Sequence, residues 1–189
     1  MDFLGQHAAW IAFGVTAVVA LLAAVIDFRR FRVPNVLTFP LCLSGLLFHT
    51  IVHGWAGLQY SAGGIALGIL ALIVFYIVGV MGAGDVKLLA AVGAWIGPVN
   101  TLYVFCVAGL AAGVHSLVVL ACQSRLREIP LILQVTFFQL ITLGRHMAGS
   151  ESASLGAAVQ RSDRTRYVMP FAVMIAIGVL AVAVWGWTY

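Results

Sequence analysis

Two aspartates, Asp27 and Asp85, are the residues of this chain whose type and position best suit chemistry. The sequence is 63% hydrophobic and has only six acidic residues among 189. Asp27 ends the apolar run Ile11–Ile26, and Asp85 follows the run Ile65–Val80 after a short glycine-containing spacer. A carboxylate in a membrane helix costs roughly 2.5 kcal/mol or more at full depth, so it is a functional-site candidate by default.

Two carboxylates in one wet pocket can divide the work of an acid and a base. Like charges close together resist simultaneous ionisation, so one group keeps its proton while the other is ionised. The ionised group takes a proton from water, which attacks a peptide carbonyl, and the protonated group supplies a proton to that carbonyl. This is aspartic-protease chemistry, and it needs neither a metal nor a covalent intermediate.

The composition predicts an all-α polytopic membrane protein. Mean hydropathy is +1.09 and 8% of residues are charged, whereas soluble domains have about 25% charged residues. The length suits a single integral-membrane domain over residues 1–189, and the N-terminus lacks the basic region of a secretory signal, so the first apolar run is expected to be retained. The net charge of +4 is spread over loops without an aromatic-interleaved basic patch, so we expect no nucleic-acid binding.

Apolar runs bounded by charge or by Gly and Pro predict about six transmembrane helices, since a span needs about 20 residues. The predicted spans are 8–26, 36–53, 58–80, 82–96, 99–122 and 169–187. The apolar segment 129–143 is short for a span, and its crossing would place the arginines of 144–167 outside. We therefore expect an interfacial or re-entrant segment within a largely cytoplasmic stretch, 125–167.

The basic residues predict the orientation and bring the two aspartates to one side. The loop after the first span holds Arg29, Arg30 and Arg32, whereas the loops at 53–57 and 97–100 hold no Lys or Arg. The positive-inside rule then places the N-terminus outside and the arginine loop in the cytoplasm. The second and third spans lead out and back, so both aspartates are expected at the cytoplasmic leaflet, at a separation that topology does not fix.

The residues that flank the aspartates favour access of water to each carboxylate. Gly82 and Gly84 permit positive φ, so the chain can unwind before the next helix and expose Asp85 to a water-filled cavity. Pro34 stops the preceding helix and begins the second span.

Simpler interpretations stay open. Asp27 can be an interfacial residue paired with Arg29 or Arg30, and Asp85 can be a helix cap paired with Lys87. Lys87 itself can shift the pKa of Asp85, bind a substrate carboxylate, or act only as an anchor at the membrane interface. The joint occurrence of both aspartates at matching depth favours a shared site.

The segment Asp27–Thr38, which contains Val33-Pro34-Asn35, resembles the first-aspartate motif of type IV prepilin peptidases. Gly82-Ala-Gly-Asp85-Val-Lys87-Leu resembles the second motif of that family, GxGDxKL. The C-terminal segment Tyr167–Ala172 is similar to the apolar proline segment that opens the family's last span. Together the three segments extend over most of the chain.

The resemblance implies an endopeptidase of the bacterial inner membrane that removes the short basic leader of prepilins, after a glycine, on the cytoplasmic side. It assigns catalysis to Asp27 and Asp85, and it implies that neighbouring motif residues shape the site. Those residues are Pro34, Asn35, Gly82, Gly84 and Lys87. The implied partners are a prepilin or pseudopilin precursor and the lipid bilayer, with no cofactor.

Cysteine usage refines the resemblance. Cys42, Cys106 and Cys122 form no CxxC pair and no zinc-like spacing, so we expect free thiols and no metal. The larger family members carry paired CxxC motifs in a region that N-methylates the new terminus, and this sequence lacks it. It resembles the small peptidase-only form found with tight-adherence (Flp) pili, so no methyltransferase activity is expected.

Two other functional classes compete with a peptidase. A proton-coupled transporter or channel would use the aspartates as relay groups, but it would place them near the midplane and often show repeat symmetry. A non-catalytic pilus assembly protein would not need the carboxylates at all.

Histidines and glycines add smaller expectations. His49 and His53 have i, i+4 spacing but lie toward the outer side, away from the aspartates, so we assign no metal to them. Trp95 falls near a span end, where an interfacial position is expected. Three glycine pairs have the small-xxx-small spacing of helix packing faces. They are Gly64/Gly68, Gly93/Gly97 and Gly109/Gly113.

Overall fold

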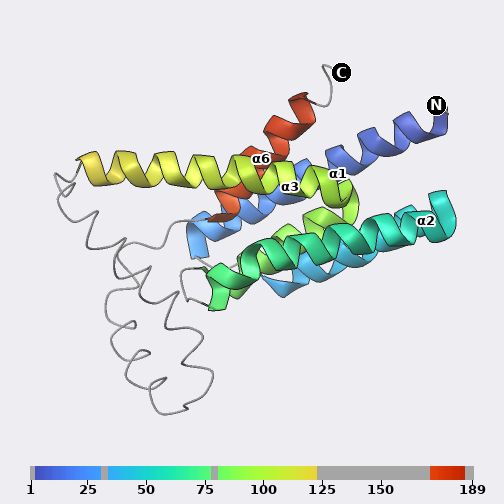
Figure 1. The fold of residues 1–189 in the computed structure, drawn as a ribbon, viewed down its shortest axis with the longest axis horizontal. Coiled ribbons are helices and arrows are strands. Elements are labelled where there is room, and N and C mark those ends of the chain that lie inside the picture. The colour runs from blue at the N-terminus through green and yellow to red at the C-terminus, as the bar shows by residue number, and fades with distance from the viewer. Residues whose placement is uncertain (1–2, 31–33, 78–80, 123–170, 186–189) are drawn as a thin grey trace, which may run out of the picture. The chain divides into compact units, whose positions relative to one another are not determined.

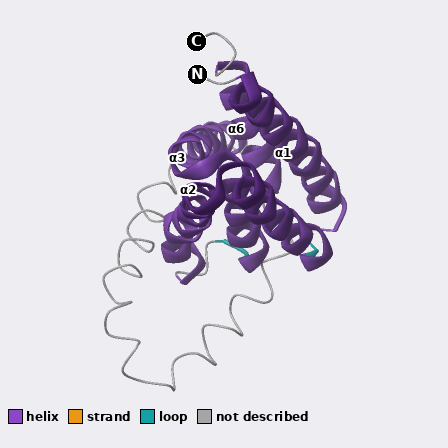
Figure 2. Cartoon of the chain, turned by 90° about the vertical axis from the view of Figure 1, so that its right-hand side faces the viewer, coloured by secondary structure: helices purple, strands orange, loops and turns teal. Residues whose placement is uncertain are grey.

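The computed structural model describes residues 3–30, 34–77, 81–122 and 171–185, which are almost entirely helical (Figures 1 and 2). The elements are α1 (Phe3–Arg30), α2 (Asn35–Ile77), α3 (Ala83–Cys122) and α6 (Phe171–Trp185). The chain divides into two compact units, and the first contains α1, α2, α6 and α3 as far as Gly113. The predicted interfacial stretch, 125–167, lies outside the described residues.

The described helices are apolar enough for a membrane protein. Three of them have the length and composition to cross a bilayer, over Trp10–Asp27, Asn35–Ile77 and Ala83–Val119, with mean hydropathies of 2.2, 2.1 and 2.1. Helix α6 is also apolar but shorter, at 15 residues. An all-helical, membrane-type architecture is therefore confirmed for the part of the chain that the structure describes.

Helices α2 and α3 are each broken at one glycine. Gly54 has φ 60° and ψ −136°, and Gly97 has φ 74° and ψ 177°. Both have the positive φ that glycine adopts without a Cβ penalty. The chain doubles back at each break (Figure 1), and Gly57 lies directly against the His49 carbonyl across the first one. The breaks fall within the two loops that the sequence predicted, 53–57 and 97–100.

Glycine also allows α2 and α3 to touch backbone to backbone. A Cβ on Gly64 would stand 1.9 Å from the carbonyl oxygen of Gly93, and one on Gly93 would stand 2.3 Å from that of Gly64. A Cβ on Gly68 would meet the Ala90 backbone at 2.7 Å. These predicted packing faces are confirmed, whereas Gly109 and Gly113 have open space where a Cβ would point.

Helix α3 starts at Ala83, after the non-helical Gly82, and takes Gly84 and Asp85 into its first turn. Neither Gly82 nor Gly84 uses the positive φ that it permits. One sequence expectation needs correction. Trp95 is not at an interface: it is 6% exposed and donates from Nε1 to the Leu41 carbonyl at 2.8 Å. Its ring occupies the space that the missing side chain of Gly45 leaves.

We expect Gly93→Val to destabilise the protein by about 1–3 kcal/mol, because the new side chain must push α2 and α3 apart. Gly109→Ala is the matched control, since its Cβ meets no atom and alanine favours helix by roughly 1 kcal/mol. Thermal unfolding in detergent measures both. A Gly93→Val protein as stable as the wild type would contradict the close contact.

Candidate active site

Asp27 is a buried carboxylate near the C-terminal end of α1. Its side chain is 6% exposed, and its Oδ2 accepts a hydrogen bond from the backbone N–H of Ala172 at 3.4 Å. Helix α1 packs along α6, which brings together residues 145 positions apart in sequence. A buried charge is stable only with compensating partners, and here the first turn of another helix supplies one.

Asp85 lies in the first turn of α3 and is half-buried. Its carboxylate turns back over Gly82, so that a Cβ added to Gly82 would stand 3.6 Å from Oδ2 of Asp85. The backbone N–H of Gly82 donates to this carboxylate. The backbone N–H of Asp85 in turn donates to the Gly82 carbonyl at 3.2 Å. The small Gly82 therefore leaves room for the carboxylate at a helix N-terminus, where the macrodipole favours negative charge.

The fold brings the two aspartates together. Their carboxylates are close enough for Coulombic repulsion between the charged forms. Within the described residues, no ion pair joins Asp27 to Arg29 or Asp85 to Lys87. Of the ion pairs that the sequence left open, Asp27–Arg29 and Asp85–Lys87 are thus not formed, and the side chain of Arg30 is not among those described.

Lys87 instead joins the beginnings of two helices. Its Nζ donates to Oδ1 of Asn35 at 3.0 Å, linking the first turns of α3 and α2. Pro34 precedes α2, and its carbonyl accepts the N–H of Leu37 at 3.0 Å. The two sequence motifs are therefore connected by a hydrogen bond between Asn35 and Lys87, two helical residues that the sequence could group only by family likeness.

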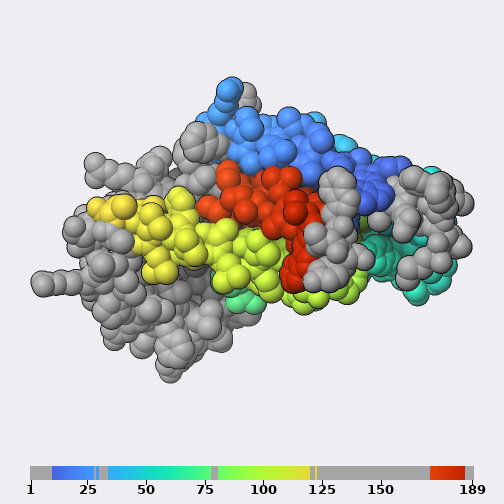
Figure 3. Space-filling model, turned by 90° about the horizontal axis from the view of Figure 1, so that it is seen from above, coloured from blue at the N-terminus to red at the C-terminus, as the bar shows by residue number. Residues whose placement is uncertain are grey.

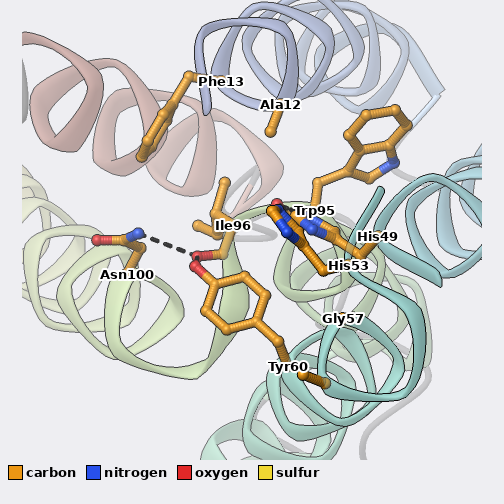
Figure 4. A pocket seen from close by; sticks show the side chains of 10 residues that line it. Ala12, Phe13, His49, His53, Gly57, Tyr60, Trp95, Ile96 and Asn100 are labelled. Atoms are coloured by element: carbon orange, nitrogen blue, oxygen red, sulfur yellow. Dashed lines mark hydrogen bonds between the residues drawn. The ribbon is translucent and has the colours of Figure 1, made fainter. Parts of the chain in front are cut away.

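A separate cavity lies at the Gly97 break and contains neither aspartate (Figure 4). Its volume is about 380 Å³, and its polar lining includes His49, His53, Tyr60 and Asn100. His49 is 6% exposed and donates from Nε2 to the Trp95 carbonyl at 2.8 Å. His49 therefore hydrogen-bonds to the backbone of α3, a role that the sequence did not assign to it.

Side chains bind four consecutive carbonyls at this break. The last carbonyls of a helix lack intrahelical partners, and Pro98 has no N–H to give to Ala94. Ser61 donates to the Ala94 carbonyl at 2.7 Å, and Tyr60 donates to that of Ile96 at 2.7 Å. Further donors are His49 to Trp95, Asn100 to Ile96 at 3.0 Å and Thr101 to Gly97 at 2.6 Å. These residues stabilise the break.

We expect Ser61→Ala to cost about 1–3 kcal/mol, because it leaves the buried Ala94 carbonyl without its donor. Ser44→Ala is the matched control, since the exposed Ser44 only donates within its own helix to Leu41. Chemical or thermal unfolding of both variants in detergent checks the difference. Equal stabilities would show that Ser61 is dispensable at the break.

The sequence did not identify two parts of this arrangement. Ala172 acts through its backbone N–H, which carries no residue-type signal. Ser61 and Tyr60 are ordinary polar residues in an apolar run, and only the fold shows that they face the broken helix. The proline at position 98 is the one local sign that a carbonyl nearby needs another donor.

Comparison with known proteins gives a consistent result. The family model of the type IV leader peptidase family matches residues 14–117, which include both aspartates and both glycine breaks. A prepilin leader peptidase/N-methyltransferase of Dickeya chrysanthemi is 40% identical over 81 residues, covering 39% of this chain and 28% of that protein. The protein of the same description from Vibrio cholerae serotype O1 is 31% identical over 97 residues, covering 48% and 38%. The chain thus spans well under half of either relative, and no solved structure matches.

Proposed function

Because the chain belongs to the type IV leader peptidase family, we propose that it is a membrane aspartic endopeptidase that removes the N-terminal leader of type IV prepilins. The observation that carries the proposal is the convergence of Asp27 and Asp85 from two helices without a cation between them among the described side chains. The names of the two relatives support the substrate class.

The proposed reaction uses one carboxylate as base and the other as acid. The ionised aspartate takes a proton from water, and the water oxygen forms a bond to the scissile carbonyl carbon. The protonated aspartate gives its proton to the carbonyl oxygen. Collapse of the tetrahedral intermediate breaks the C–N bond, and the proton held by the base goes to the leaving amine. As the carbonyl re-forms, the other aspartate takes a proton back from a hydroxyl of the intermediate, so both aspartates return to their starting protonation states.

The motif residues beside the aspartates would fix their geometry. Gly82 accommodates the Asp85 carboxylate and donates to it, and Gly84 adds no side chain beside Asp85 in the first turn of α3. Pro34, Asn35 and Lys87 hold the start of α2 against the start of α3. Displacement of reacting groups by about 1 Å can cost 10²-fold in rate, so such supports matter to catalysis.

We further propose six crossings, with the N-terminus outside and the aspartates at the cytoplasmic face of a bacterial inner membrane. The breaks at Gly54 and Gly97 support this arrangement, because three of the four pieces, 35–53, 55–77 and 98–122, have about the length of a span, whereas 83–96 is shorter. Arg29 and Arg30 at the end of α1, and Arg32 after it in sequence, support the orientation.

The finer assignment is a peptidase-only enzyme of the Flp type. The cysteines of this sequence lie too far apart to form the CxxC pairs of the bifunctional members. The mature product is then unmethylated, and mass spectrometry of its N-terminal peptide distinguishes the two forms by one methyl group.

We expect Asp27→Asn and Asp85→Asn each to lower the rate of leader cleavage by about 10²–10⁴-fold, since each removes a catalytic acid or base. Each variant is co-expressed with a candidate prepilin, and cleavage is followed by the decrease in the mass of the prepilin. Glu128→Gln, which changes a carboxylate outside the motifs, is the control.

Full cleavage by either asparagine variant would overturn the proposed mechanism. Ion flux into vesicles without peptidase activity would favour a transporter. Asparagine variants that restore pilus assembly in a deletion strain would favour a non-catalytic assembly protein.

The orientation is tested by labelling introduced cysteines in a background in which the three native cysteines are alanine. Trp55 and Val36 are suitable positions, because their side chains are 72% and 84% exposed. We expect a membrane-impermeant maleimide to label Trp55→Cys in intact spheroplasts and Val36→Cys only after permeabilisation. The reverse pattern would invert the proposed topology.

A further inference from the structure

Helix α6 lies outside the matched region of the chain, yet its first turn contacts a proposed catalytic group. The family match ends at residue 117, whereas α6 begins at Phe171. Its first two residues are buried, Ala172 completely and Phe171 to 8% exposure. Figure 3 shows α6, in red, beside α1, in blue, where the two helices pack along each other.

The contact is a hydrogen bond from a helix N-terminus to a buried charge. The first N–H groups of a helix have no partner within it, and they carry the positive end of its dipole. The Ala172 N–H points to Asp27 Oδ2 at 3.4 Å, and both residues are shielded from solvent. Asp27 thus completes the first turn of α6, and α6 in turn stabilises the ionised carboxylate.

A second contact prevents α6 from sliding along its neighbours. A Cβ on Gly178 would stand 2.7 Å from the carbonyl oxygen of Val104 in α3, so the two backbones touch there. Helix α6 is therefore fixed against α3 at Gly178 and against α1 along its length. Its N-terminus has a defined position relative to Asp27.

We propose that the N-terminus of α6 is a positioning element of the active site, in which the Ala172 amide holds one oxygen of Asp27 and leaves the other to accept the proton of water. The inference rests on the proposed peptidase function and extends it to a helix that the matched region does not include. Ala172 contributes through its backbone N–H, so only the packing around it restricts the size of its side chain.

The test removes the amide hydrogen and leaves the rest of the turn in place. Ala172→Pro does this, because proline lacks an N–H and is tolerated in the first helical turn. Val173→Pro is the matched control, since it removes the next amide in the same turn. We expect kcat of Ala172→Pro to fall by about 10–100-fold with KM unchanged, as for a misplaced catalytic group, and kcat of Val173→Pro to stay within a few-fold of wild type.

If Ala172→Pro does not accumulate, an α-hydroxy acid introduced at position 172 replaces the amide with an ester and removes the N–H without a ring. Unchanged kcat, equal losses at positions 172 and 173, or a loss confined to KM would each overturn the inference. The wild type and Asp27→Asn are measured alongside. An inactive wild type or an active Asp27→Asn would instead defeat the proposed function, so the two failures are distinguishable.

Discussion

The structure depends on satisfying backbone polar groups in surroundings that offer no water. An unbroken apolar helix meets this condition through its own hydrogen bonds, but a helix that breaks and turns back does not. At Gly97 the chain turns with a positive φ that only glycine adopts easily, and Pro98 withdraws one more N–H. Ser61, His49 and Tyr60 of α2 replace the missing donors at three successive carbonyls. The turn in α3 is thus possible only with α2 beside it.

The same closeness of α2 and α3 connects the fold to the site. Donors as short as the Ser61 hydroxyl reach the α3 carbonyls only if the backbones nearly touch, which Gly64 and Gly93 allow. Farther along the same pair of helices, Lys87 joins Asn35 and fixes the first turn of α3, which carries Asp85. The close glycine contact between α2 and α3 therefore also helps to position the carboxylate of Asp85.

Each aspartate contacts the N-terminal turn of a helix, and this offers a common way to keep negative charge in an apolar protein. Asp85 belongs to the first turn of its own helix, whereas Asp27 sits against the first turn of α6. N–H groups and the helix dipole stabilise a carboxylate without neutralising it. An arginine or lysine in salt-bridge contact would hold it permanently ionised, which suits an ion pair better than a group that must exchange protons.

The sequence by itself determined the membrane class, the two candidate aspartates and the positions of both glycine breaks. These follow from local properties, namely apolar runs, charges that are costly to place in an apolar segment, and residues that interrupt helices. The family resemblance was also readable, because its motifs are contiguous. The sequence misjudged Trp95 as an interfacial residue. Local pattern cannot weigh the gain of filling the space over Gly45.

Only the tertiary structure decided what each carboxylate contacts and which donors complete the broken helix. The Asp27–Ala172 bond joins residues 145 positions apart through a backbone N–H that every non-proline residue has, so no residue type marks it. Ser61 and His49 look like isolated polar residues until α2 lies against the Gly97 break. Contacts of this kind depend on the packing of whole helices, and that packing is a property of the assembled bundle.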